Sequence, residues 1–311
     1  MPEPRSVVIT GASRGLGLAS AIHLYNRGWR VVGAMRSPQA GLERLRAATG
    51  AGADDPRLVG VQLDLDDPES IAAAARAVKQ QLGAPDVLVH NAGIAAVGCV
   101  EEMPVSVWKQ IFSTNLLGPV ALTRELLPSM RAAGRGRIVV LSSAGGIRGM
   151  PSISAYSAAK GALERWAEAL AEEIAPFGLG VTILVAGTFK TDMLTEQTHH
   201  HGDLKGPYAA HYAGIDRTGG LMVRLASPPE RFARALARAL DERAPFARHA
   251  VGLDARMLLF GSRILPARIL HGVVRLAMRL PRRGALRRGQ VAQNSVPSPA
   301  DAKSSMADPA V

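Results

Sequence analysis

Cysteine is almost missing from this sequence of 311 residues, which contains only one, Cys99. A lone cysteine cannot form a disulfide within the chain, and this usage is typical of a protein of the reducing cytoplasm. The sequence also lacks an apolar run of the roughly 20 residues that a membrane-spanning helix needs. Its first residues do not combine a basic segment with a long apolar one, so we expect no secretory signal and a cytoplasmic location.

Acidic residues are also scarce: the chain has 26 aspartates and glutamates but 37 lysines and arginines, which gives a net charge of +11. The excess is local, since residues 248–290 have a net charge of +9 and the rest of the chain only +2. The one acid of this segment is Asp254, and its arginines are Arg248, Arg256, Arg263, Arg268, Arg275, Arg279, Arg282, Arg283, Arg287 and Arg288. Phe260 is the only aromatic residue there that can stack on a base, so we expect no nucleic-acid partner.

Short apolar runs alternate with helical patterns along most of the chain. The predicted strands are Ser6–Thr10, Arg30–Ala34, Leu58–Leu63, Val87–His90, Arg137–Leu141, Gly180–Val185 and a short one near Ala247–Gly252. The predicted helices are Gly15–Arg27, Pro68–Gln81, Val105–Met130, Ala155–Ala175 and Pro229–Arg243. Continuous apolar strands that alternate with helices are typical of a parallel sheet buried on both faces. Residues 1–255 therefore predict an α/β domain with a doubly wound parallel sheet and helices on both faces.

Three segments depart from this alternation. Residues 188–227 are rich in glycine and include His199–His201, which predicts an irregular lid over the binding site. Adjacent histidines do not easily converge on one ion, so we expect no metal. Residues 256–288 predict a basic amphipathic helical extension, and residues 289–311, rich in Ser, Pro, Ala and Asp, predict a disordered tail.

The extension places leucine, isoleucine and valine among regularly spaced arginines from Leu253 to Leu280. Its apolar face can cover a substrate pocket or a subunit interface. It can equally lie on an anionic membrane surface, which would add a peripheral membrane contact to a cytoplasmic protein. The sequence leaves both interpretations open.

A glycine-rich turn follows the first predicted strand. It reads Thr10-Gly11-Ala12-Ser13-Arg14-Gly15-Leu16-Gly17 and opens a helix. Glycines at such a turn let the backbone approach a pyrophosphate, whose charge is stabilised at the helix N-terminus. The candidate cofactor contacts in this turn are Gly11, Ser13, Arg14, Gly15, Leu16 and Gly17.

The end of the second strand bears on which dinucleotide binds. NAD-binding sheets have an acidic residue there that holds the ribose hydroxyls. This chain instead reads Gly33-Ala34-Met35-Arg36, and Arg14 lies in the glycine turn. Two guanidinium groups suit a 2′-phosphate, and a charge-assisted hydrogen bond contributes about 1.5–3 kcal/mol. We therefore predict a preference for NADP(H), the alternative being that both arginines are solvated surface residues.

Three residues at and beyond the end of the fifth strand form a candidate catalytic group. Ser143 ends that strand, Tyr156 follows thirteen residues later, and Lys160 lies four residues further along one helix face. Tyrosine is a poor acid or base at its ordinary pKa of about 10. One lysine charge ~4 Å away, at an effective dielectric near 20, lowers that pKa by about 3 units. A serine hydroxyl can hold the substrate oxygen while tyrosine donates its proton.

Taken together, these motifs resemble those of the short-chain dehydrogenase/reductase family. The matching segments are Thr10–Gly17 as T-G-x-x-x-G-x-G, Asn91–Gly93 as N-A-G, Asn115, Ser143 and Tyr156–Lys160. The resemblance is dense over residues 5–195 and looser to residue 255. It implies a Rossmann-type fold and an NADP(H)-dependent oxidoreductase that reduces a ketone or aldehyde or oxidises a secondary alcohol.

The resemblance also implies roles for single residues. Tyr156 would be the acid/base, and Lys160 would lower its pKa and bind the nicotinamide ribose. Ser143 would orient the substrate oxygen, and Asn115 would hold a water linked to Lys160. The remaining implied cofactor contacts are Asn91 and Gly93 beside the adenosine ribose, Asp64 at the adenine and Thr191 near the nicotinamide.

Two positions depart from the family pattern. His90 stands where the family has the first asparagine of N-N-A-G. Ala186 precedes Gly187 where the family has proline, in the segment that meets the nicotinamide amide. The second departure concerns that contact and leaves the expected reaction unchanged.

Family members commonly pair through helices that match residues 105–130 and 155–175, so we expect a homodimer or homotetramer. Met150, Met193 and the extension favour an apolar, lipid- or steroid-like small-molecule substrate. The alternative function is a non-catalytic nucleotide sensor on the same fold. Such a sensor would not need Ser143, Tyr156 and Lys160 together.

Overall fold

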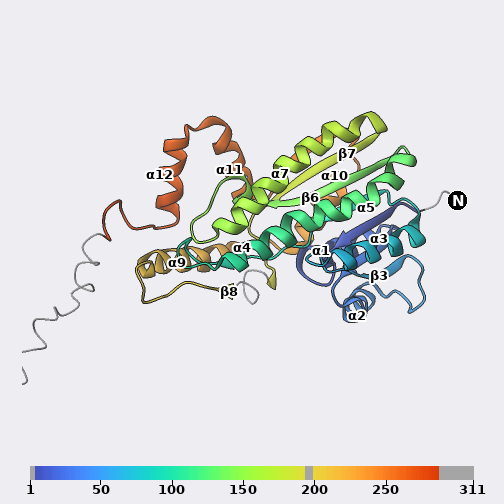
Figure 1. Cartoon of the computed structure of the whole chain (residues 1–311), viewed down its shortest axis with the longest axis horizontal. Coiled ribbons are helices and arrows are strands. Elements are labelled where there is room, and N and C mark those ends of the chain that lie inside the picture. Colours follow the sequence, from blue (N-terminus) through green and yellow to red (C-terminus); the bar gives the residue numbers. More distant parts are fainter. Residues whose placement is uncertain (1–3, 193–198, 287–311) are drawn as a thin grey trace, which may run out of the picture.

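Seven parallel strands form the centre of the computed structural model, which describes residues 4–192 and 199–286. The strands are β1 (Ser6–Thr10), β2 (Arg30–Met35), β3 (Leu58–Gln62), β4 (Val87–His90), β6 (Gly136–Ser143), β7 (Leu179–Ala186) and β9 (Phe246–Val251). They lie in the order β3-β2-β1-β4-β6-β7-β9, and every neighbouring pair is parallel (Figure 1). Because the order reverses between β1 and β4, the predicted doubly wound sheet is confirmed.

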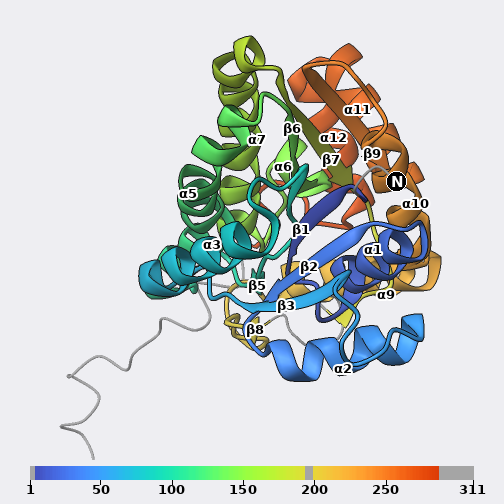
Figure 2. The ribbon, with the colours of Figure 1, turned by 90° about the vertical axis from the view of Figure 1, so that its right-hand side faces the viewer.

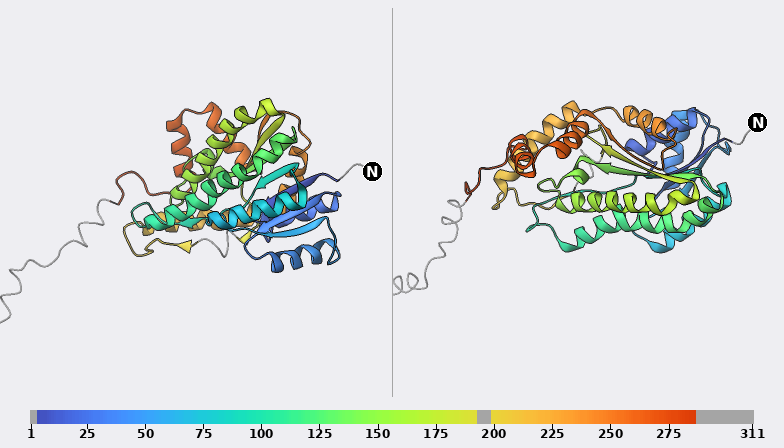
Figure 3. Two further views of the ribbon diagram at one scale, coloured as in Figure 1. Left: turned by 45° about the vertical axis from the view of Figure 1, so that its right-hand side comes forward. Right: turned by 90° about the horizontal axis from the view of Figure 1, so that it is seen from above.

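Helices cover both faces of the sheet, as the view from above in Figure 3 shows. On one face lie α3 (Pro68–Leu82), α5 (Gly118–Ala132) and α7 (Ser154–Ile174), which share an apolar core with the strands. On the other face lie α1 (Gly15–Asn26), α2 (Pro38–Thr49) and α10 (Pro229–Ala239), which form a second core. Strand residues alternate between the two cores, with Val8 in the first and Val7 and Ile9 in the second. Each strand is therefore buried on both faces, as its continuous apolar sequence indicates.

The predicted helix Val105–Met130 is not one regular helix. It consists of α4 (Val105–Phe112), a π-helical turn η1 (Ser113–Leu117) and α5. A π turn is a local widening of the helix that often marks a functional position. Here it contains Asn115, whose side chain bonds both backbone polar groups of Ile94.

The prediction of an irregular segment at 188–227 is wrong, because it contains the helix α9 (Ala209–Leu225). His199–His200 form a strand, β8, that pairs with β5 (Ala96–Val97). The buried Tyr212 on α9 accepts a hydrogen bond from the backbone of Cys99. These contacts fix the segment on the loop after β4 (Figure 2), and glycine content alone did not reveal the helix.

Three further elements complete the central part of the chain. Sequence reasoning missed α2, although Pro38 at its start and Gly50 in a left-handed conformation after its end are ordinary helix boundary signals. It also missed the short helix α6 (Ala144–Ile147) that follows β6. A 3₁₀ turn, η2 (Ala175–Phe177), joins α7 to β7.

The C-terminal extension forms two helices, α11 (Leu253–Ile264) and α12 (Ala267–Ala277). They form a helical pair at one end of the molecule, beside α9 (Figure 1). Within residues 4–192 and 199–286, no helix is both long enough and apolar enough to cross a membrane. The predicted disordered tail and Met193 lie outside the described residues.

Candidate active site

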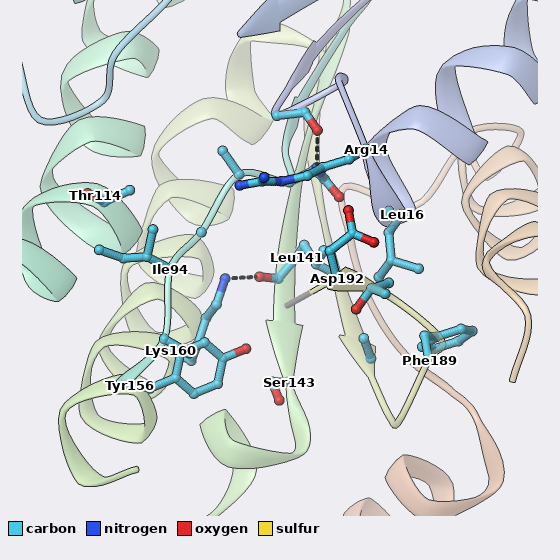
Figure 4. A pocket seen from close by; sticks show the side chains of 18 of the residues that line it. Arg14, Leu16, Ile94, Thr114, Leu141, Ser143, Tyr156, Lys160, Phe189 and Asp192 are labelled. Carbon is cyan, nitrogen blue, oxygen red and sulfur yellow. Dashed lines mark hydrogen bonds between the residues drawn. The ribbon is translucent and has the colours of Figure 1, made fainter. Parts of the chain in front are cut away.

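A cavity of about 970 Å³ opens along the carboxyl ends of the parallel strands. Figure 4 shows part of its lining. Predicted site residues that line it are Gly11, Ser13, Arg14, Gly15, Leu16, Arg36, Asp64, Asn91, Gly93, Ser143, Tyr156, Lys160 and Thr191. The structure thus brings together the glycine turn, the end of β2 and the tyrosine–lysine pair, which are far apart in the sequence.

The glycine turn leaves the start of α1 open to an anion. Gly11 and Gly15 have positive φ angles of 69° and 54°, which other residues rarely adopt. A Cβ atom at Gly11 would lie 3.0 Å from the backbone of Ala92, so the turn also has no room for a side chain. No side chain caps α1, and its first turn contains no acid. The free N–H groups at this helix start therefore fit a pyrophosphate.

Gly17 is not among the residues that line the cavity, and the structure gives it a packing role. A Cβ atom there would lie 2.3 Å from the carbonyl oxygen of Gly11 and 2.5 Å from the Asn91 side chain. Asn91 donates hydrogen bonds to the carbonyls of Thr10 (2.8 Å) and Gly11 (3.3 Å). The buried Thr10 hydroxyl in turn accepts from the backbone N–H groups of Asn91 and Ala92. These bonds join the ends of β1 and β4, and Gly17 lets α1 pack closely against them.

Three arginines surround the end of the cavity next to β2. Arg14 and Arg36 line it as expected, and Arg44 on α2 joins them. Arg44 donates to the backbone carbonyl of Ser13 at 3.2 Å and is therefore attached to the glycine turn. Arg44 was missed because the helix that holds it was missed.

The catalytic candidates lie together in the middle of the cavity. Tyr156 and Ser143 line the same part of the cavity, and the Ser143 hydroxyl accepts from the backbone N–H of Gly145 at 3.3 Å. Lys160 is buried, and its ammonium donates to the carbonyl of Leu141 at 2.7 Å (Figure 4). That ammonium lies 5.9 Å from the centre of the Tyr156 ring. All three side chains come from β6 and α7, which pack directly on each other.

The pKa of the tyrosine is opposite in direction to the expectation. Burial raises the pKa of Tyr156, and the polar Ser143 hydroxyl offsets only part of that rise. Burial lowers the pKa of Lys160 to about 8, and the carboxylate of Glu164 opposes this shift. Desolvation of the hydroxyl is thus the main cause of the shift, and the charge of Lys160 is not among its causes. A tyrosine that retains its proton is suited to donate it to a carbonyl oxygen.

Asn115 lies behind the site and does not line the cavity. Its side-chain oxygen accepts from the N–H of Ile94 at 2.8 Å, and its amide donates to the carbonyl of Ile94 at the same distance. These bonds use one lone pair and one N–H of the side chain, and the expected role of Asn115 in holding a water stays a prediction. A Cβ atom at Gly93 would lie 3.2 Å from Asn115 and 3.5 Å from the Lys160 ammonium, so this glycine gives the lysine its space.

A buried carboxylate one helical turn after Lys160 ties several elements together. Glu164 accepts from the hydroxyl of Ser142 and from Arg248 of β9. It is 1% exposed, so this pairing is what makes a charge tolerable there. The arrangement fixes the end of β6, and thus Ser143, relative to α7. Sequence reasoning missed Glu164, although its position four residues after Lys160 is a readable signal.

The segment with alanine in place of proline is held by a carboxylate from the extension. Asp254 accepts from the backbone N–H of Thr188 at 2.7 Å and from its hydroxyl at 2.8 Å. A Cβ atom at Gly187 would lie 1.8 Å from this carboxylate, so glycine is required there. Gly187 and Thr188 line the cavity together with Thr191. Asp254, the single acid of the arginine-rich segment, therefore shapes the cavity wall.

The far end of the cavity is mostly apolar. Its walls there come from the loop before α7, from α9 and from the residue that follows α12. The apolar residues are Met150, Ile153, Ile215, Met222, Val223 and Met278. The His199–His200 strand is exposed, although His200 touches the cavity. Within the described ranges, no group of three or more His, Cys, Asp or Glu residues is arranged to hold a metal ion.

Comparison with known proteins assigns the chain to a family. Residues 5–202 match the model of the short chain dehydrogenase family. The chain belongs to the short-chain dehydrogenase/reductase family. An uncharacterized oxidoreductase of Escherichia coli K12, YbbO, is 31% identical over 87% of this chain and 94% of its own length. Dehydrogenase/reductase SDR family member 7B of Xenopus tropicalis is 35% identical over 76% of this chain and 74% of its own.

Other relatives agree with this assignment. The uncharacterized oxidoreductase YusZ of Bacillus subtilis is 36% identical over 60% of this chain, which spans 65% of that relative's length. A short-chain dehydrogenase from Streptomyces avermitilis has a TM-score of 0.74 and 34% identity over 95% of this chain and all of its own. A metagenomic short-chain oxidoreductase in complex with NADP has a TM-score of 0.62 and 27% identity over 79% of this chain and 96% of its own. The chain is thus an NAD(P)-dependent oxidoreductase of this family.

Proposed function

We propose that the enzyme uses NADP(H) to interconvert a ketone or aldehyde and the corresponding alcohol, with Tyr156 as the proton donor and acceptor. The observation that carries this proposal is that Tyr156, Ser143 and the buried Lys160 line the same cavity as an uncapped helix start. When bound, the nicotinamide supplies or accepts the hydride. The cofactor fits the residues present, because the open start of α1 and the small glycines leave space for its phosphates and backbone.

The side chains divide the remaining work. Ser143 holds the substrate oxygen through its hydroxyl and keeps it next to Tyr156. In reduction, Tyr156 donates its proton to that oxygen, and in oxidation it takes the proton back. Lys160 places a positive charge behind the tyrosine and offers its ammonium to the nicotinamide ribose. Asn115 holds the Ile94 backbone. The missing side chain at Gly93 leaves space for the Lys160 ammonium to reach the nicotinamide ribose.

NADP(H) is the proposed cofactor because the end of β2 offers only cations to the ribose. Arg14, Arg36 and Arg44 surround this end of the cavity, and β2 ends at Met35 without a carboxylate. The NADP complex of the metagenomic relative supports this proposal. We place Asp64, which also lines the cavity, at the adenine. Thr191 lies against Gly15, because a Cβ atom at Gly15 would lie 3.4 Å from the Thr191 side chain. We place Thr191 beside the nicotinamide half of the cofactor.

An apolar small molecule is the proposed substrate. Three methionines from separate elements, Met150, Met222 and Met278, line the far end of the cavity, and unbranched methionine adapts to varied apolar shapes. The segment 188–227 would act as the lid, because α9 supplies one of these walls. We expect a cytoplasmic homodimer or homotetramer that pairs through α4, α5 and α7. Sedimentation or light scattering measures the oligomeric state directly.

Turnover with a panel of ketones and aldehydes tests the reaction, with NADPH oxidation as the readout. Tyr156→Phe removes only the hydroxyl, and we expect it to lower kcat by about 10²–10⁴-fold while the cofactor still binds. Tyr208→Phe is the matched control, because this tyrosine bonds Glu101 at 2.6 Å outside the cavity. Full activity of Tyr156→Phe would refute the mechanism. Tight NADPH binding by the wild type without turnover of any carbonyl would favour the nucleotide sensor, which the presence of Ser143, Tyr156 and Lys160 disfavours.

The apolar preference has its own test. In a series of ketones with longer alkyl chains, kcat/KM is expected to rise with each added methylene. Met222→Asn is expected to reduce this gain, whereas Met257→Asn, a substitution outside the cavity, leaves it unchanged. A series with no dependence on chain length would contradict the proposed substrate class and leave the reaction type untouched.

A further inference from the structure

Two apolar stripes lie exposed on the extension. On each helix, large apolar side chains recur at spacings of three and four residues, which places them along one helix face. The stripes consist of Leu253, Met257, Phe260 and Ile264 on α11 and of Ile269, Val273 and Leu276 on α12. These seven side chains are between 51% and 82% exposed. Leu259 and Leu270 point the other way and are buried against the rest of the protein.

Arginines surround these stripes. The exposed arginines of this surface are Arg256, Arg263, Arg268, Arg279, Arg282 and Arg283. Over residues 253–286 the only acid is Asp254, and its carboxylate is already bonded to Thr188. The surface therefore combines helical stripes of apolar residues with an excess of positive charge. We call these residues the α11–α12 surface.

The charge of this surface decides among the partners that an apolar face can have. A second copy of the chain, packed through the same face, would bring arginines against arginines with no free acid to pair them. A nucleic acid would find one stacking residue, Phe260, and an otherwise aliphatic face. An anionic lipid surface offers both an apolar interior and negative phosphates, and thus complements both features.

We propose that the α11–α12 surface docks the enzyme on anionic lipid membranes. The apolar stripes enter the boundary between headgroups and acyl chains, and the arginines contact the lipid phosphates. Helices of this kind lie in the plane of the membrane and do not cross it, in agreement with the lengths of α11 and α12.

Docking would place the cavity next to the lipid. Met278, directly after α12, lines the cavity, and Thr218 of α9 donates to the carbonyl of Ala277 at 3.3 Å. The wall of the cavity and the docked surface are therefore parts of one packed unit. The docking proposal does not depend on the proposed substrate, since it concerns residues outside the cavity.

Co-sedimentation of the full chain with vesicles tests the proposal. We expect binding to vesicles that contain phosphatidylglycerol, much weaker binding to pure phosphatidylcholine, and a loss of binding as salt is added. Each arginine near an anionic surface contributes roughly fivefold to binding, so Arg263→Gln/Arg268→Gln should lower the partition coefficient about 25-fold. Its matched control is Arg135→Gln/Arg165→Gln, which removes two arginines that are 70% and 65% exposed elsewhere.

Apolar substitutions test the other half of the surface. Phe260→Ser/Leu276→Ser should lower the partition coefficient by at least about tenfold, because both side chains would leave the lipid. Val100→Ser/Phe177→Ser is the control, since these residues are 66% and 47% exposed on other elements. Cofactor binding and thermal unfolding of each variant show that it is folded.

Several outcomes would overturn the proposal. Absence of wild-type binding to anionic vesicles at low ionic strength would do so, and so would binding that both α11–α12 variants leave unchanged. Light scattering supplies the third outcome. If Phe260→Ser/Leu276→Ser dissociates an oligomer while the wild type ignores vesicles, the surface is a subunit interface.

Discussion

Replacement of Arg36 by alanine should shift the enzyme away from NADPH without affecting NADH. Arg36 follows the last residue of β2 and lines the cavity together with Arg14 and Arg44. NADPH differs from NADH only in its 2′-phosphate, so loss of a guanidinium that binds this phosphate affects one cofactor and not the other. The site contains no carboxylate at the end of β2 that would favour the ribose hydroxyls of NADH.

The expected size of this effect follows from the exposure of the arginines. A hydrogen bond to a charged group contributes about 1.5–3 kcal/mol, which is roughly ten- to a hundredfold in affinity. Arg36 and Arg44 are both exposed, and water and salt weaken their attraction to the phosphate. We therefore expect the lower end for Arg36→Ala, about tenfold, and up to about a hundredfold when Arg44→Ala is added.

Initial rates at varied NADPH and NADH measure the change, and titration calorimetry measures the two dissociation constants directly. KM for NADPH should rise about tenfold in Arg36→Ala, and KM for NADH should stay the same. Arg76→Ala on α3, an exposed arginine outside the cavity, is the matched control. Equal losses for both cofactors, or wild-type affinity for NADPH in the double variant, would refute the assignment of these arginines to the phosphate.

Three further predictions concern two buried groups and one hydrogen-bonded pair. Because burial lowers the pKa of Lys160 to about 8, the unfolded chain binds more protons than the folded chain above that pH. The free energy of unfolding of the wild type, measured in urea relative to that of Lys160→Met, should thus rise by about 2 kcal/mol from pH 8 to 9.5. A difference in unfolding free energy that does not change with pH would contradict this. Burial likewise lowers the pKa of His90 to about 3, so stability falls as the pH drops below about 6.5. His90→Asn should abolish about 3 kcal/mol of this loss at pH 4. An acid limb unchanged by His90→Asn speaks against this. Finally, Thr188→Val should raise the dissociation constant for NADPH about fivefold, and Asp254→Ala should raise it at least about tenfold, as measured by fluorescence titration. Wild-type affinity in both variants would mean that the bond between the two residues does not shape the site.

Much of the fold was predictable because each strand is buried on both faces. Strands β1 and β4 were predicted with their observed ends, since continuous apolar runs such as Val87–Val89 have no other stable place in a parallel sheet. The tyrosine and lysine were predictable for a similar local reason, because four residues along a helix always return to the same face.

The missed parts depend on contacts between distant residues. The π turn at 113–117 cannot be read from its own residues, because it is stabilised by the bonds of Asn115 to Ile94. The helix α9 is similar, since its glycine-rich sequence is a weak helix former and its buried Tyr212 is fixed by the backbone of Cys99. The direction of the Tyr156 pKa required the depth of the hydroxyl, which a motif does not contain.

The bond between Thr188 and Asp254 has a consequence for how the enzyme is made. A ribosome synthesises a chain from its N-terminus, and domains begin to fold as they emerge. The glycine turn, Tyr156 and Lys160 emerge early, but the carboxylate that holds Thr188 comes 66 residues after it. Met278, at the end of the cavity, comes later still. A nascent chain therefore has the residues of the phosphate-binding turn early, but α1 packs against α10, which is made only after residue 228. Both halves of the site thus depend on C-terminal elements, and the site is complete only after these have been made.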